Sequence, residues 1–207
     1  MALVTVSNNS LTAVTALPAS APTGALTLIK SITASSSASI SFVDGASDVV
    51  LDGTYKSYIF KFIDIHPATD AAEFQFNVSI DSGSNYNVTK TSTFFSARHS
   101  EDDSSEVGLT YFTADDLAQS TNFQNIYVNA GNGNDECVVG NLQIFSPNSD
   151  TFVKHFISRM QGYHNANSSF EYHIAGYANT TSAVNAIQFK MSSGNIDSGI
   201  IKLYGVL

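Results

Sequence analysis

The chain has 207 residues, which is enough for one large domain with its own core. It carries 9 basic against 18 acidic residues, so with neutral histidines its net charge is −9, which argues against a nucleic-acid-binding protein. Charged residues are 13% and hydrophobic residues 43% of the chain, so its surface is rich in hydroxyl and amide groups, as is typical of strands joined by turns.

The first 24 residues differ from the rest of the chain. They combine small residues, prolines and scattered Leu and Val without a sustained period of 2 or 3.6, which predicts an extended arm. Such an arm has enough apolar side chains to dock on another surface, and the alternative is a frayed terminus. The arm residues expected to make contacts are Leu11, Val14, Leu17, Pro18 and Pro22. We therefore divide the chain into an attachment arm, 1–24, and a β-sandwich domain, 25–207.

From residue 25 onward, apolar and polar residues alternate in short runs separated by turn residues, which predicts about eleven strands. The first two runs form a hairpin-like pair around residues 33–36, and Tyr58, Phe60 and Phe62 share one strand face. The predicted strands are 25–32, 37–43, 58–64, 73–80, 93–98, 123–130, 137–145, 152–160, 170–177, 186–191 and 199–206.

One segment, 114–119, favours a helical turn, because Thr113 can cap it and two acids lie in its first turn. The many short strands without alternating helices predict an all-β fold. We expect an antiparallel, jelly-roll-like β-sandwich with an extended N-terminal arm. No apolar run approaches 18 residues and the first residues lack a basic, then apolar, signal pattern, so we expect neither membrane insertion nor a secretory signal.

Residues 79–86 (SIDSGSNY) fit the Asp-box pattern Ser-x-Asp-x-Gly-x-x-aromatic, which is seen in sialidases and other β proteins. In that pattern the Asp side chain bonds turn amides and the Gly supplies a positive φ. Asp81 and Gly83 are therefore predicted to be a structural turn. Sialidases carry several copies and a cluster of arginines, whereas this chain has one copy, so we do not expect sialidase activity.

Two acidic loops, 101–106 and 132–136, are candidates for calcium because that ion prefers several oxygen ligands. Their carboxylates also raise the possibility of a glycosidase pair, which needs two such groups facing a groove. Neither loop matches the calcium-loop template, and solvated loop acids are the common case. We expect no bound metal or cofactor and no catalytic residue.

Three histidines, His155, His164 and His173, lie on or between two neighbouring predicted strands and meet if these form a hairpin. Imidazoles bind transition metals, but cross-strand or interface roles are commoner. The single cysteine, Cys137, excludes an intramolecular disulfide and is expected to be a small buried hydrophobe.

Several tyrosines lie at predicted strand ends or in loops beside Asn and Asp. Such rings stack on sugars in glycan sites and are equally frequent in protein interfaces, and the sequence does not separate these uses. The candidate glycan or interface contacts are Tyr86, Tyr111, Tyr163 and Tyr177, with Tyr55 in a similar position.

The C-terminal segment 187–206 (IQFKMSSGNIDSGIIKLYGV) resembles the closing segment of structural proteins from tailed phages of marine bacteria, notably cyanophages. Residues 66–70 (HPATD) and 82–89 (SGSNYNVT) are similar to the same group, so the likeness spans most of residues 31–206. The resemblance implies a component of the virion. It concerns the fold and implies no catalytic residue.

Three functions compete. The preferred one is a non-enzymatic capsid decoration or head-appendage protein, located in the virion and attached by its arm to the major capsid protein or a tail protein. The alternative is a tail-fibre or receptor-binding protein that recognises host surface glycans, and the third is a sugar-cleaving enzyme. A fibre generally needs a long shaft, whereas here the arm runs directly into one domain. We expect a homotrimer, because shell appendages and fibres commonly use three-fold sites.

Overall fold

A computed structural model describes residues 26–103 and 107–207. These residues form 12 strands and no helix. The all-β class is therefore confirmed, while the arm and its predicted contacts Leu11, Val14, Leu17, Pro18 and Pro22 lie outside the described residues. The strands are β1 (Leu26–Ser37), β2 (Ile40–Val43), β3 (Ser57–Pro67), β4 (Ala72–Ser79), β5 (Lys90–Ser100), β6 (Gly108–Tyr111), β7 (Gln124–Ala130), β8 (Val138–Phe145), β9 (Lys154–His164), β10 (Ser168–Ala178), β11 (Ala186–Met191) and β12 (Ile196–Val206).

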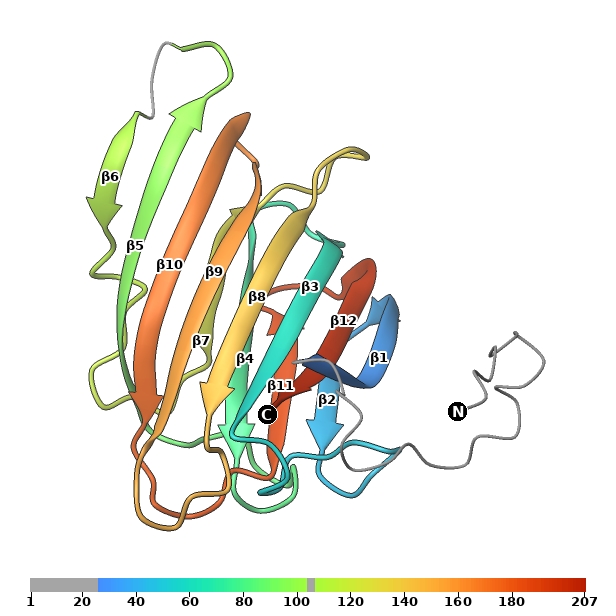
Figure 1. Cartoon of the computed structure of the whole chain (residues 1–207). Coiled ribbons are helices and arrows are strands. Elements are labelled where there is room, and N and C mark those ends of the chain that lie inside the picture. Colours follow the sequence, from blue (N-terminus) through green and yellow to red (C-terminus); the bar gives the residue numbers. More distant parts are fainter. Residues whose placement is uncertain (1–25, 104–106) are drawn as a thin grey trace, which may run out of the picture.

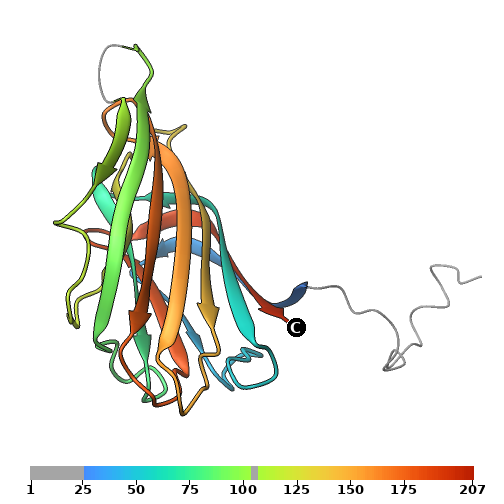
Figure 2. The same cartoon turned by 60° about the vertical axis from the view of Figure 1, so that its left-hand side comes forward.

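All strand pairs are antiparallel, and the sheet curls until it is nearly closed into a barrel (Figure 1). One layer has the order β6-β5-β10-β9-β8-β3-β12-β1, and β7-β4-β11-β2 lie behind it. Figure 2 brings β5, β10 and β9 of the first layer to the front. The layers join where Ala130 of β7 pairs with His164 of β9. The antiparallel arrangement is confirmed, whereas the jelly-roll form of the sandwich is not.

The strands follow the period of 2 that their sequences carry. In β9, Phe156, Ser158 and Met160 are buried, while the alternate residues Ile157 and Arg159 are exposed. A strand turns successive side chains to opposite faces, so each strand contributes one row to the core and one row to an outer surface. That outer row is what builds the candidate sites described below.

The core is a cluster of phenylalanines between the two layers. The Phe189 ring of β11 lies 5.2 Å from Phe60 and 5.1 Å from Phe62, measured between centroids, and 6.0 Å from Phe74. Phe42 lies 6.3 Å from the same ring. All five side chains are buried. Edge-to-face and offset contacts of this kind add to the free energy gained by burying the rings.

The predicted hairpin between the first two strands is wrong. β1 pairs only with β12, while β2 pairs only with β11. The chain leaves one layer at the end of β1 and enters the other at Ile40. The two strands therefore find their hydrogen-bond partners between 143 and 180 residues further along the chain rather than in each other.

The predicted helical turn at 114–119 is also wrong, although a tight turn begins there, since Asp115 and Asp116 both donate backbone bonds to Phe112. The following backbone groups instead form hydrogen bonds with β5. The carbonyl of Leu117 accepts from the amide of Ser92, and Ser120 pairs with Lys90. These longer-range bonds replace the local ones that a helix needs.

Candidate functional site

The outward side chains of β6, β5, β10 and β9 form one continuous surface, which we call the outer face. Strand register places Tyr111 opposite Phe95, Phe95 opposite His173, and His173 opposite Arg159. The Phe95 and His173 rings are stacked at 5.0 Å with only 4° between their planes. Sequence-distant rings are therefore aligned by cross-strand pairing.

The outer face exposes large apolar side chains. Leu109 is 78% exposed and Ile157 53%, while Phe95 and Tyr111 are also exposed. Isolated surface hydrophobes are ordinary, but a group of them on adjacent strands marks an interaction surface.

Charges on the outer face are paired with each other. Glu171 of β10 accepts a hydrogen bond from Arg159 of β9, and His173 Nε2 lies 3.3 Å from the same carboxylate. The Arg159 bond lowers the pKa of Glu171. Arg159 and Glu171 are the only Lys, Arg, Asp or Glu residues among the described outward positions of these four strands. The face therefore mixes apolar and uncharged polar side chains and is close to neutral on a chain of net charge −9.

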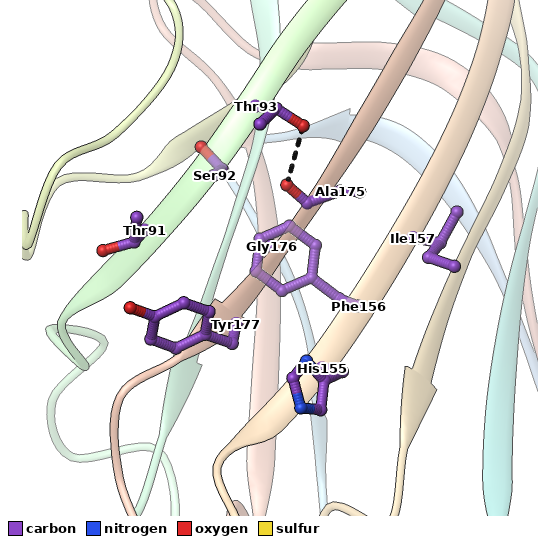
Figure 3. Close-up of a pocket in the computed structure, with 9 residues that line it drawn as sticks. All are labelled: Thr91, Ser92, Thr93, His155, Phe156, Ile157, Ala175, Gly176 and Tyr177. Carbon is purple, nitrogen blue, oxygen red and sulfur yellow. Dashed lines mark hydrogen bonds between the residues drawn. The ribbon is translucent and has the colours of Figure 1, made fainter.

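A shallow depression of about 510 Å³ lies on this face, across β5, β10 and β9 (Figure 3). The depression forms because Ala175 and Gly176 are small, and the side chains of Tyr177 and Ile157 flank it. The His155 ring meets Tyr177 edge-on at 6.2 Å. The lining residues include the His155 imidazole and the Tyr177 hydroxyl but no carboxylate, thiol or ammonium group, so most of the depression is apolar contact surface.

A second hollow, of about 540 Å³, lies on the outward side of the other layer, and we call it the polar hollow. Its floor is a cross-strand row: Lys190 of β11 pairs with Gln75 of β4, and Gln75 pairs with Asn125 of β7. The remaining lining residues are Tyr86, Ala114, Asp115, Leu117, Thr121, Asn122 and Phe123. It thus combines amides, rings, one carboxylate and one ammonium group.

A chain of hydrogen bonds crosses the polar hollow. Gln75 Nε2 donates to Asn125 Oδ1 at 2.7 Å, and Asn125 Nδ2 donates to Asp115 Oδ1 at 2.7 Å. Partial burial raises the pKa of Asp115. At the other end, Lys190 Nζ lies 4.4 Å from the centre of the Phe123 ring, a cation–π contact.

The four candidate tyrosines lie at separate places. Tyr177 borders the depression, and Tyr111 lies at the β6 edge of the same face, where its hydroxyl donates to Asp116 at 2.6 Å. Tyr163 lies in a third hollow at the far end of β9, and a hydrogen bond with Glu101 raises its pKa. Tyr86 lines the polar hollow. Tyr55 instead packs on Tyr58.

The Asp-box segment forms a hydrogen-bonded turn. Asp81 Oδ1 accepts from the Ser79 hydroxyl at 2.6 Å and from the Asn85 amide at 2.9 Å, and these bonds lower the pKa of Asp81 to about 2. Gly83 has φ +82°, a value that favours glycine. The turn holds the start of the loop that carries Tyr86.

The three histidines do not meet. His155 contacts Tyr177, His173 stacks on Phe95, and the His164 ring stacks on Phe170 at 4.1 Å. Within the described residues no group of three His, Cys, Asp or Glu side chains can hold a metal. Cys137 is only half-buried, and burial raises the pKa of its thiol.

The two acidic loops each place one carboxylate, Glu101 and Asp135, in the lining of the third hollow, which has a volume of about 380 Å³. Glu101 contacts Tyr163, whereas Glu136 accepts from the backbone amide of Gly133 at 2.5 Å and so stabilises its own turn. Residues 104–106 of the first loop lie outside the described residues.

Sequence reasoning missed most of the polar hollow. Gln75 and Asn125 occupy outward positions of ordinary alternating strands, where polar residues are expected to meet solvent. The sequence signal that could have indicated the polar hollow is the cluster 121–125 (TNFQN), in which amide side chains flank an aromatic ring.

Comparison with protein-family models, with curated proteins and with solved structures found no match to this chain. No described helix is long and apolar enough to cross a membrane.

Proposed function

We propose that the chain is a non-enzymatic structural protein of a phage virion, of the capsid decoration or head-appendage kind. The observation that carries this proposal is the outer face, a sheet surface that exposes Phe95, Leu109 and Ile157 and whose charges are already paired. Contact surfaces have this chemistry, with rings and aliphatic side chains at the centre and few unpaired charges. The phage resemblance of residues 31–206 supplies the virion setting.

The occupant we propose for the outer face is a second copy of the chain, within a homotrimer. Two copies of a −9 chain repel each other unless the approaching surfaces lack unpaired carboxylates. The outer face meets this condition, because Glu171 is bonded to Arg159. Residues 1–24 then remain available to attach the trimer to the major capsid protein or to a tail protein.

Replacing Ile157 with glutamate tests the outer face. We expect the full chain to have three times the 22.1 kDa mass of one chain by light scattering, and Ile157→Glu to shift it to the monomer, because each copy then buries an unpaired carboxylate. The matched control is Ile80→Glu, an exposed isoleucine after β4. A trimer that survives Ile157→Glu, or that dissociates equally in both variants, contradicts this interface.

A second candidate function is recognition of host surface glycans. The observation that favours it is the place of Tyr86, which lines a hollow together with three amide side chains. Sugar sites combine such rings and amides. The two functions are compatible, because the polar hollow and the outer face lie on different layers of the sheet.

A further inference from the structure

We propose that the polar hollow is a binding site for one neutral sugar ring of a glycan chain. This inference rests on the second candidate function and gives it a site and a ligand class. It does not depend on where the protein sits in a particle. Four features carry it: the amide floor, the ring walls, the balanced charge and the buried groups that hold the rim.

The floor offers both donors and acceptors in a line. Gln75 uses one amide N–H on Asn125, which leaves its carbonyl oxygen and its second N–H available to a ligand. Asn125 uses one N–H on Asp115 and likewise retains its second N–H. A sugar hydroxyl both donates and accepts, so it matches a floor of this kind. The two residues lie on neighbouring strands, about 4.8 Å apart, a separation close to the width of a sugar ring.

The walls supply apolar surface beside these polar groups. Phe123 and Tyr86 both line the hollow, and each is only half-buried. The C–H face of a sugar packs on such rings while its hydroxyls point to the floor. Lys190 also lines the hollow, with its ammonium group over the Phe123 ring, and its N–H groups are donors that a ligand hydroxyl can accept from.

The charges in the polar hollow favour a neutral ligand. Lys190 lies at one end of the row and Asp115 at the other. An ionic ligand of either sign is attracted by one of these groups and repelled by the other, so it gains little net Coulomb attraction. A hydroxyl-rich ring without charge can accept a hydrogen bond from Lys190 and donate one to Asp115.

Buried polar side chains hold the rim of the hollow in place. Asn77, which is fully buried, donates to the carbonyl of Tyr86 at 2.7 Å and to that of Thr121 at 3.0 Å. Lys90 Nζ in turn donates to Asn77 Oδ1 at 2.6 Å. Buried polar groups cost free energy unless every one is bonded. Here they tie two rim loops to one strand.

The third rim segment is held in the same way. Gln124, also fully buried, donates to the backbone carbonyl of Asp115 at 2.9 Å and accepts from the Ser92 hydroxyl at 2.5 Å. All three segments that wall the polar hollow are therefore fixed before a ligand arrives. A rigid site of this kind loses little conformational entropy on binding.

The test is titration of the full chain with neutral methyl glycosides of glucose, galactose, mannose and N-acetylglucosamine, followed by saturation-transfer NMR. Glucuronic and N-acetylneuraminic acids serve as anionic probes. We expect saturable binding of at least one neutral glycoside, weakened about tenfold by Gln75→Leu. The matched control is Gln188→Leu, since Gln188 lies two residues from Lys190 on β11 and outside the hollow, and this variant is expected to bind normally.

Asn122→Ala provides a second variant, because Asn122 is exposed at the rim and its loss leaves the core intact. Equal loss of binding in the control, retention of binding in both hollow variants, or binding of the anionic sugars alone overturns the proposal. So does the absence of saturable binding to every neutral glycoside. These outcomes leave the trimer and particle experiments unaffected, so the two proposals fail separately.

Discussion

Replacing Phe189 with alanine is expected to lower the free energy of unfolding by about 3–5 kcal/mol. The Phe189 ring is fully buried and contacts four other phenylalanine rings from both layers. Its removal leaves a cavity between the two layers. The layers cannot move together to fill this cavity, because each strand is hydrogen-bonded to its neighbours. Urea unfolding followed by tyrosine fluorescence or circular dichroism measures the change.

The control for this variant is Phe152→Ala. The prediction placed Phe152 in the strand 152–160, but β9 begins at Lys154 and the Phe152 side chain is 71% exposed. Its truncation is expected to change the free energy of unfolding by no more than about 0.5 kcal/mol. Equal effects of the two substitutions contradict the placement of Phe189 at the centre of the core.

Because of Lys90, we expect the free energy of unfolding to increase as the pH rises from 7 to 8.5. Its side chain is fully buried, and burial lowers its pKa to about 7 in the folded protein. In the unfolded chain the pKa returns to about 10.5. Between these values the unfolded state binds a proton that the folded state lacks, so the free energy of unfolding increases with pH, by up to about 1.4 kcal/mol per unit.

Lys90→Met removes this contribution, and the slope of the free energy of unfolding against pH should flatten. Burial also lowers the pKa of Lys154, so a smaller slope of the same sign is expected to remain. Lys61→Met, at an exposed lysine, is the control and should keep the full slope. An unchanged slope in Lys90→Met contradicts the assignment.

Most strands were predictable because they are long enough to show a period of 2. Alternation in 58–64 placed Tyr58, Phe60 and Phe62 on one face, and all three are buried. β6, of only four residues, gave no such signal, since it becomes a strand by pairing with β5. The mistaken hairpin has the same origin, because the choice of β12 rather than β2 as the partner of β1 depends on the whole fold.

The candidate sites were less predictable than the strands. Tyr86 stays a predicted glycan or interface contact, and its neighbours Gln75 and Lys190 come from strands that meet only through register. Asn77 occupies an outward strand position, and it is buried because loops that include Tyr86 and Thr121 cover it. A sequence pattern reports which face a residue takes, not which distant loop closes over that face.

The proposed attachment to a phage particle is measured by the occupancy of the protein on purified particles, using quantitative mass spectrometry and electron cryomicroscopy. The full chain and a chain lacking residues 1–24 are supplied in parallel to assembling particles. We expect the full chain at regular sites and no truncated chain on the particles, while the truncated β domain stays folded in solution. Particles without the full chain, or full occupancy by the truncated chain, would contradict the proposed attachment.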